Sequence, residues 1–248
     1  MKPAVEPEDY RVSHSGPGSF SDSYDEKLFS PGTYDSRVWQ EEQQLLDWLV
    51  ETWVPSRGRY LDFACGTGRI IVHLESRFEV SVGLDVSESM LAAGRQQVRK
   101  AALVCGDATR TADLVPGTFD CITAWRFFLN AQPELRDEAM AFLAGKLATP
   151  ESTLIFNVHG NRISSRWIMV TLDRLRGRHN NAMSVGEVRR LVKRHGLKIV
   201  DWHGIMCLDK SFYNYLPRGL WAFFERTLRA MGFPKRWYVY LVFVCRKA

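Results

Sequence analysis

Short apolar runs alternate with segments of helical character through the first two thirds of the sequence. Five of these runs have the length and composition of buried strands, at residues 60–64, 80–84, 102–105, 119–124 and 153–158. The segments between them, at 68–76, 87–99 and 133–147 and in a short stretch after Asp107, have the pattern of helices. Strands and helices that alternate at this spacing predict βαβ units and a parallel sheet.

A helix is also expected before the first strand, over residues 36–53, because apolar residues recur there at helical spacing. Pro55 and Gly58 would end it. Residues 1–23 include a stretch rich in serine, glycine and proline, which predicts a flexible segment, with structure beginning near Tyr24.

The regular alternation of strands and helices ends near residue 160. Ser184 and Glu187 have the spacing of a capping box, which predicts a helix that runs through His195 and stops at Gly196. Further strands are predicted at 197–205 and 237–245. The remaining segments, 161–182 and 208–235, are expected to be loops and helices that cover one end of the sheet.

Within the last of these segments, aromatic and basic residues occur together. Leu220, Phe223, Phe224 and Leu228 share a helical stripe, and the expectation is that this stripe packs on the domain. A substrate lid, a dimer contact or a membrane-surface helix would fit the same residues.

The overall composition, 46% hydrophobic and 25% charged, is that of a globular protein. No apolar run approaches the roughly 20 residues of a membrane span, and the N-terminus lacks the apolar stretch of a signal peptide. A cytoplasmic protein is therefore predicted. The five cysteines form no C-x-x-C pair and the histidines lack metal-ligand spacing, so neither a disulfide framework nor a metal site is expected.

The net charge of +5 is unevenly divided. Residues 1–160 hold 15 Lys and Arg against 23 Asp and Glu, a balance of −8, whereas residues 161–248 hold 18 against 5, a balance of +13. A basic C-terminal third fits an anionic substrate, a nucleic acid or a membrane surface, and it equally fits a solvated basic face without a ligand.

The most informative segment is 60–70, YLDFACGTGRI, where an apolar strand leads into a turn of small residues and then into a helix. Gly66 and Gly68 would let the backbone approach a ligand closely, and N–H groups at the start of the helix can face an electron-rich ligand edge. Asp62 is an acid at a strand end, for which a cationic ligand amine would be a good partner.

Two more acids follow the next two strands. Asp85 lies 23 residues after Asp62, and Asp107 lies 22 residues after Asp85. The three acids would project at the carboxyl edge of the sheet, where ligands bind in open α/β folds.

On these residues the sequence resembles the class I S-adenosylmethionine-dependent methyltransferases, whose first motif is an acid followed by a glycine-rich turn. Ala64 stands where that family usually has its first glycine. The resemblance implies that Asp85 holds the ribose hydroxyls and that Asp107 receives the adenine amino group. An N-terminal segment bearing Tyr24 and Tyr34 would close over the cofactor, or pack in the ordinary way. The cofactor-binding residues implied in this way are Tyr34, Asp62, Ala64, Cys65, Gly66, Asp85, Val86, Met90, Gly106, Asp107, Ala108 and Trp125.

NAD is the competing cofactor. Its fingerprint requires a third small residue after the two glycines, and that position is the bulky Ile71. The Gly106–Asp107 step would also have no role with NAD. S-adenosylmethionine, with S-adenosylhomocysteine as the product, is therefore preferred.

The acceptor side is expected after the fourth and fifth strands. Arg126 could bind an acid group of the substrate, or pair with a neighbouring acid. His159 is the histidine best placed to act as a base, if the acceptor must lose a proton. Trp125 and Phe127 could pack on a ligand or belong to the core.

The resemblance to this family implies a doubly wound α/β fold with a seven-stranded, mostly parallel sheet and an antiparallel last strand. Residues 24–248 would form one methyltransferase domain, with a cofactor-binding half (24–160) and a substrate and cap half (161–248). The leading hypothesis is methyl transfer to an O or N nucleophile of a small, anionic or neutral metabolite. An RNA methyltransferase that uses the basic C-terminal region, and a non-catalytic cofactor-binding protein, are the alternatives.

Overall fold

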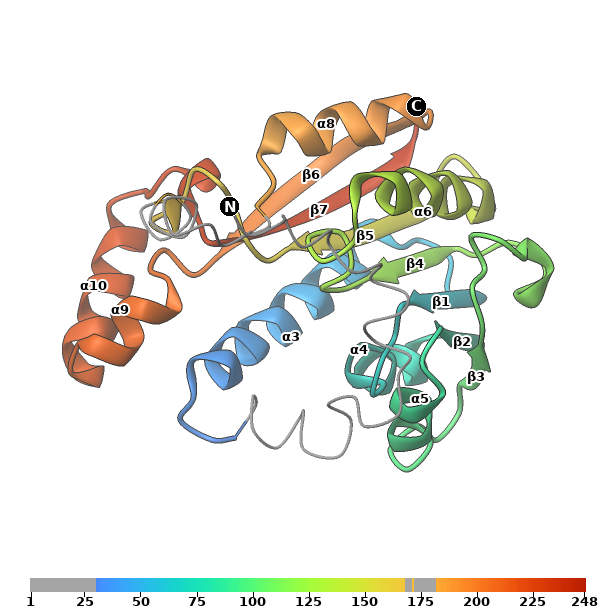
Figure 1. The fold of residues 1–248 in the computed structure, drawn as a ribbon, viewed down its shortest axis with the longest axis horizontal. Coiled ribbons are helices and arrows are strands. Elements are labelled where there is room, and N and C mark those ends of the chain that lie inside the picture. The colour runs from blue at the N-terminus through green and yellow to red at the C-terminus, as the bar shows by residue number, and fades with distance from the viewer. Residues whose placement is uncertain (1–29, 168–170, 172–181) are drawn as a thin grey trace, which may run out of the picture.

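The computed structural model describes residues 30–167, 171 and 182–248, so the predicted flexible segment 1–23 and Tyr24 lie outside the described residues. The described chain forms a seven-stranded sheet of order β3-β2-β1-β4-β5-β7-β6 (Figure 1). Its strands are β1 (Arg59–Phe63), β2 (Val80–Asp85), β3 (Ala102–Cys105), β4 (Cys121–Ala124), β5 (Thr153–Val158), β6 (Leu197–Ile205) and β7 (Tyr240–Lys247). β7 pairs antiparallel with both β5 and β6, whereas β1 to β5 pair in parallel. The predicted fold class is confirmed.

Helices cover both faces of the sheet (Figure 1). The helices of these two layers are α3 (Tyr34–Trp53), α4 (Arg69–Leu74), α5 (Glu88–Gly94), α6 (Pro133–Lys146) and α8 (Val185–Arg194). α3, α4 and α5 lie on one side, and α6 and α8 lie on the other. Each face has its own apolar core, because alternate residues of a strand point to opposite sides. In β5, for example, Phe156 packs towards α6 and α8, whereas Ile155 packs towards α3 and α4.

The predicted helix over 87–99 is shorter than expected, because α5 ends at Gly94. The N–H groups of Arg99, Lys100 and Ala101 instead donate to the carboxylate of Glu75, at 3.0, 2.9 and 2.7 Å. The buried Glu75 carboxylate thus accepts hydrogen bonds from backbone N–H groups that would otherwise have bonded within a longer helix. The capping box of Ser184 and Glu187 is present as predicted.

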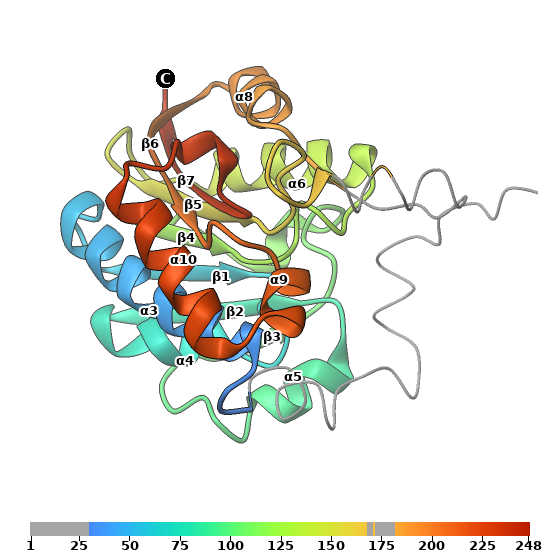
Figure 2. The ribbon, with the colours of Figure 1, turned by 90° about the vertical axis from the view of Figure 1, so that its left-hand side faces the viewer.

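A cap of two helices, α9 (Lys210–Tyr215) and α10 (Arg218–Ala230), lies beyond the carboxyl ends of the parallel strands and faces the viewer in Figure 2. The expectation that the Leu220 stripe packs on the domain is wrong. Trp221 and Glu225 are the buried residues of α10, at 3% and 6% exposure, whereas Leu220, Phe223 and Phe224 are exposed. Hydrogen bonds explain this orientation. The Glu225 carboxylate accepts hydrogen bonds from the backbone N–H groups of Cys207 and Leu208, so the side of the helix that carries Glu225 faces inward.

Candidate functional site

The turn after β1 has an unusual backbone. Ala64, Gly66 and Gly68 all have positive φ angles, of 56°, 55° and 87°. Gly68 is the N-cap of α4, and its left-handed conformation turns the chain from the strand into the helix. Ala64 adopts the same region with a side chain, which costs a non-glycine residue about 1 kcal/mol.

Asp85, at the end of β2, fixes this turn. Its Oδ2 accepts a hydrogen bond from the backbone N–H of Gly66 at 2.8 Å, and its Oδ1 accepts one from Ser87 at 2.9 Å. Asp85 therefore lies beside the turn that contains Gly66. Met90 of α5 packs against this turn. A Cβ placed on Gly66 would be 3.7 Å from the Met90 methyl carbon.

The segment after β3 also meets Asp85. The N–H of Gly106 donates to the backbone carbonyl of Asp85 at 2.9 Å, and the φ of Gly106 is 151°. Asp107 follows, and its Oδ1 accepts the N–H and the hydroxyl of Thr109. Asp85 and Asp107 thus lie at the adjacent ends of two paired strands.

Ala108, Cys65 and Val86, which were also predicted to bind the cofactor, lie in the segments that follow or join these strands. Ala108 is buried at 2% exposure and belongs to the core shared with α6 and α8, and Cys65 is 8% exposed. Val86 lies between Asp85 and Ser87, and its carbonyl accepts the thiol of Cys105 at 3.7 Å.

Asp62 is fully buried in the middle of the sheet. Its Oδ1 accepts the Thr123 hydroxyl at 2.7 Å, and Thr123 in turn contacts the Tyr60 hydroxyl at 2.6 Å. Its Oδ2 has no hydrogen-bond partner among the described residues. Burial raises the pKa of Asp62 to about 7, although the Thr123 hydrogen bond opposes this. A cationic group beside Oδ2 would remove this cost.

Tyr34 and Trp125 are placed differently from the other predicted cofactor residues. Tyr34 is 2% exposed, donates its hydroxyl to the carbonyl of Leu208 at 2.9 Å, and packs against Tyr213 and Trp221 of the cap. Trp125 is 5% exposed and donates its indole N–H to Glu42 at 2.8 Å. Both side chains are held by packing and hydrogen bonds within the protein, and their contact with a cofactor stays a prediction.

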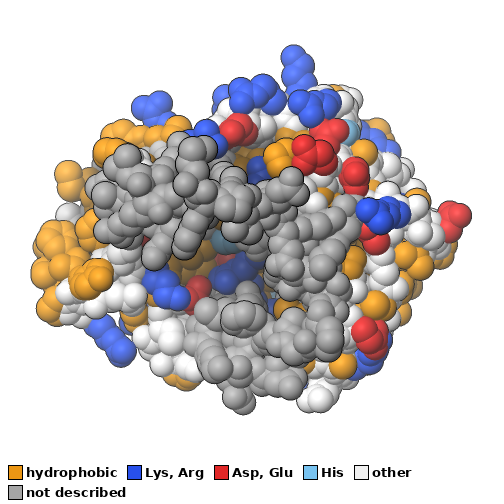
Figure 3. All heavy atoms as spheres, in the orientation of Figure 1, with side chains coloured by type: hydrophobic (Ala, Val, Ile, Leu, Met, Phe, Trp, Pro, Cys, Tyr) orange, Lys and Arg blue, Asp and Glu red, His pale blue; other side chains and the backbone are white. Residues whose placement is uncertain are grey.

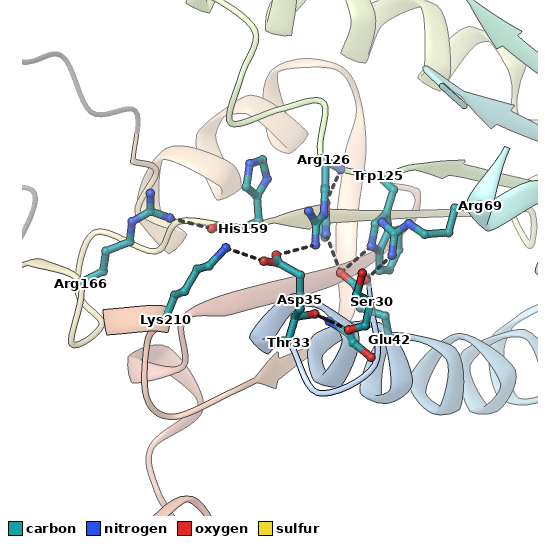
Figure 4. Close-up of polar contacts among 12 residues, drawn as sticks. Ser30, Thr33, Asp35, Glu42, Arg69, Trp125, Arg126, His159, Arg166 and Lys210 are labelled. Atoms are coloured by element: carbon teal, nitrogen blue, oxygen red, sulfur yellow. Dashed lines mark hydrogen bonds and ion pairs between the residues drawn. The ribbon is translucent and has the colours of Figure 1, made fainter. Parts of the chain in front are cut away.

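Glu42 joins the two halves of the site, and it was not predicted from the sequence (Figure 4). Besides Trp125, its carboxylate accepts Arg69 at 2.9 Å and lies 3.4 Å from the amide nitrogen of Asn157. These partners come from the glycine-rich turn region, the end of β4 and β5. Glu42 is four residues from Val38 and from Leu46, so the sequence already places an acid on the apolar face of the predicted helix. This position could have identified Glu42 as a buried acid.

Arg126, the predicted acceptor-side residue, follows β4 with a φ of 55°. Its backbone N–H donates to Oδ1 of Asn157 at 2.6 Å. Its guanidinium lies 3.6 Å from Asp35, whose other carboxylate oxygen binds Lys210 of the cap at 2.7 Å (Figure 4). Asp35 and Lys210 were not predicted, because they meet across 175 residues of chain.

His159 lies beside this cluster (Figure 4). Burial lowers the pKa of His159 well below its ordinary value, and the positive charges of Arg126 and Arg166 lower it further. Arg166 also donates to the His159 carbonyl at 3.0 Å. Such a histidine is neutral near pH 7 and can accept a proton. Arg126, after β4, and His159, after β5, thus lie near each other.

The face shown in Figure 3 is hollowed near its centre, where basic, acidic and histidine side chains are visible between the residues drawn in grey. Within residues 30–167 and 182–248, no group of three His, Cys, Asp or Glu is placed to hold a metal ion. The described helices also include none long and apolar enough to cross a membrane. Two groups of polar residues thus follow the carboxyl ends of the parallel strands, one with Gly66, Asp85 and Asp107 and one with Arg126 and His159.

Residues 61–148 match the family model described as "Methyltransferase domain". YqeM of Bacillus subtilis, which is named as a methyltransferase, is 34% identical over 146 residues, covering 57% of this chain and 55% of YqeM. The chain thus spans about half the length of that relative. A dTDP-amino-sugar N,N-dimethyltransferase of Streptomyces venezuelae is 39% identical over 59 residues, which cover 24% of this chain and 25% of that protein.

Among solved structures, magnesium protoporphyrin IX methyltransferase from Synechocystis PCC 6803 with bound SAM has the same fold. The TM-score is 0.64 at 14% identity, and the match covers 98% of this chain and all of that chain. At this identity the similarity describes the fold, which agrees with the sheet order found here.

Proposed function

We propose that this protein transfers the methyl group of S-adenosylmethionine to an O or N nucleophile on a small anionic acceptor. The match of residues 61–148 to the methyltransferase-domain model and the order of the sheet support the proposal. The observation that carries the proposal is the pairing of Gly66 with Asp85. This hydrogen bond places a close-approach backbone turn and an acid for a diol side by side.

The residues present fit the cofactor. The buried Oδ2 of Asp62 needs a cationic partner, and the amino group of the methionine part would supply it. Asp85 would hold the ribose hydroxyls, and the segment Gly106 to Ala108 would meet the adenine. When bound, the cofactor supplies a methyl group on a positively charged sulfur, which is a good leaving group.

The protein's own contribution would be alignment and control of charge. Aligning the nucleophile with the methyl carbon supplies much of the acceleration in such a reaction. His159 is neutral because its pKa is low, so it would accept the proton of a hydroxyl acceptor as the bond to the methyl group forms and that proton becomes acidic. For an acceptor that is already a free amine or an anion, no base is needed.

Charge argues for an anionic acceptor. Arg126 and Lys210 both contact Asp35, and Arg166 donates to the carbonyl of His159 (Figure 4). A carboxylate or phosphate on the acceptor would find basic side chains on this side of the molecule.

The cofactor half is tested by calorimetric titration with S-adenosylhomocysteine. The protein should bind it, and Asp85→Ala should weaken the affinity at least about tenfold through the lost diol contact. Asp201→Ala, at an acid on β6 that bonds His203, is the matched control and should bind normally. Absence of binding by the unmodified protein would refute the proposal.

The acceptor half is tested separately. With radiolabelled S-adenosylmethionine and pooled small metabolites fractionated by charge, transfer is expected into the anionic fraction. Arg126→Gln should lower this transfer without changing the affinity for S-adenosylhomocysteine. Transfer confined to neutral or cationic acceptors would contradict the anionic class while leaving the cofactor assignment intact.

A further inference from the structure

The outer face of α10 is apolar, and no residue in the described part of the chain buries it. Leu220, Phe223, Phe224 and Met231 have exposures of 42%, 61%, 42% and 79%. Their spacings of three, four and seven residues place them on one side of the helix. Figure 3 shows hydrophobic side chains gathered at the left-hand edge of the molecule, where Figure 1 places α9 and α10. Phe212, Tyr215 and Trp237, on the flanking segments, are exposed as well. These seven side chains are called the cap patch below.

Such a patch needs an explanation, because exposed apolar surface is costly unless it binds something. Its charged surroundings narrow the choice. Residues 208–237 contain two acids, Asp209 and Glu225, and both are buried, at 7% and 6% exposure. Each also has a structural role, since Asp209 caps α9 and Glu225 holds the backbone at Cys207 and Leu208.

Three basic residues of the same segment, Arg226, Lys235 and Arg236, are exposed. Of the other three, Arg218 is exposed but lies beside Gly32, whereas Lys210 and Arg229 bind the acids Asp35, Glu41 and Glu225. The surface that surrounds the cap patch therefore carries positive charge without exposed acids within residues 208–237. A helix with an apolar face, aromatic residues and flanking Lys and Arg has the features of a segment that lies in a membrane interface.

We propose that the cap patch docks on the headgroup region of an anionic lipid bilayer. Phe223, Phe224 and Leu220 would enter the boundary between headgroups and acyl chains, and Arg226 and Arg236 would meet the lipid phosphates. A second copy of the chain fits less well, because a symmetric contact would bring the same basic residues of two subunits together. RNA fits less well. Its phosphates would bind the basic residues, but it has no apolar surface to pack against the aliphatic side chains of the cap patch.

Lipid docking is independent of methyl transfer, so it is tested without cofactor or acceptor. The full chain is sedimented with vesicles made of equal parts phosphatidylglycerol and phosphatidylcholine. Binding is expected, and it should weaken at least about tenfold with phosphatidylcholine alone or in about 1 M salt, where charge is screened. Sedimentation equal with both vesicle types, or none with either, would overturn the proposal.

Two pairs of variants separate the apolar and the charged contributions. Phe223→Ser with Phe224→Ser should weaken vesicle binding at least about tenfold, whereas Trp48→Ser, at a tryptophan of α3 that is 46% exposed, should leave it unchanged. Arg226→Glu with Arg236→Glu should abolish the preference for anionic lipid. Arg189→Glu with Arg190→Glu, on exposed residues of α8, makes the same change in net charge elsewhere and should not.

The alternative occupants give distinct results. If light scattering shows a dimer that Phe223→Ser with Phe224→Ser converts to a monomer, the patch is a subunit contact and the proposal is wrong. If vesicle binding is instead displaced by RNA and is insensitive to the Phe variants, the surface recognises charge alone and the proposal is also wrong. All these residues are exposed, so unchanged unfolding midpoints are expected and serve as the folding control.

Discussion

The indole nitrogen of Trp125 donates a hydrogen bond to Oε1 of Glu42 over 2.8 Å, which joins the end of β4 to the middle of α3. Glu42 is fully buried and also holds Arg69. The helix that precedes the sheet is therefore fixed, through one carboxylate, both to the start of α4 and to the segment after β4.

Replacing Glu42 by Ala should destabilise the fold by about 3–5 kcal/mol, because it leaves Arg69 and Trp125 without their buried acceptor. Glu51→Ala, at an exposed glutamate of the same helix, should cost no more than about 1 kcal/mol. Urea unfolding measures both. Similar losses from the two variants would show that Glu42 is not a structural centre.

Asp62 should make stability fall as pH rises. Below its unfolded pKa of 3.8 both states carry the proton, and between there and about 7 the unfolded chain releases it first. Stability from this group is therefore greatest at low pH and is lost by about pH 7. Asp62→Asn should remove this part of the pH dependence, as measured by urea midpoints at about pH 5 and 8. An unchanged dependence would contradict the assigned pKa.

The same residue should couple cofactor binding to protons. A cationic amine next to Asp62 favours its charged form, so binding of S-adenosylhomocysteine near pH 6 should release a proton from this carboxyl. Calorimetry in buffers of different ionisation heat counts the released protons. Asp62→Asn should release fewer, and equal release by both proteins would place the amine elsewhere.

His159 should stay neutral through the neutral range, because burial and then Arg126 lower its pKa well below 6.5. Nuclear magnetic resonance of the imidazole C–H should show no titration between about pH 8 and 6. Arg126→Gln should raise the His159 pKa, and Arg189→Gln on α8 should not. A His159 that titrates near its ordinary value would exclude this electrostatic arrangement.

Ala64 should be a site where glycine stabilises. Its φ of 56° favours a residue without Cβ, so Ala64→Gly should gain up to about 1 kcal/mol after the entropy of the unfolded chain is counted. Ala108→Gly is the comparison, because Ala108 is buried with an ordinary φ, and it should lose about 1 kcal/mol. Thermal or urea unfolding distinguishes the two signs.

Local patterns in the sequence predicted most of the fold. The runs at 102–105, 153–158 and 197–205 became strands with the same bounds, and Ser184 capped its helix as expected. Asp62 and Asp85 could be expected at the same edge, because parallel strands end there, and the pairing of β1 with β2 agrees with this.

Contacts that depend on tertiary packing were not predictable in the same way. Asp35 and Lys210 have no shared motif, and their pairing requires the cap to fold back over α3. The orientation of α10 was predicted wrongly, because apolar residues lie both on its buried side, with Trp221, and on its exposed side, with Phe223 and Phe224. The N–H groups that bind Glu225 and fix the buried side come from another segment. The spacing of apolar residues alone could not show which side of the helix is buried.

The position of β7 has a consequence for the order of assembly. β7 follows every other strand along the chain, yet it lies between β5 and β6. During synthesis, β6 therefore emerges before the neighbour that connects it to the sheet, whereas β3, β2, β1, β4 and β5 already have their partners. The parallel strands β1 to β5 can form early, and the edge of the sheet that contains β6 would be completed last, when β7 leaves the ribosome.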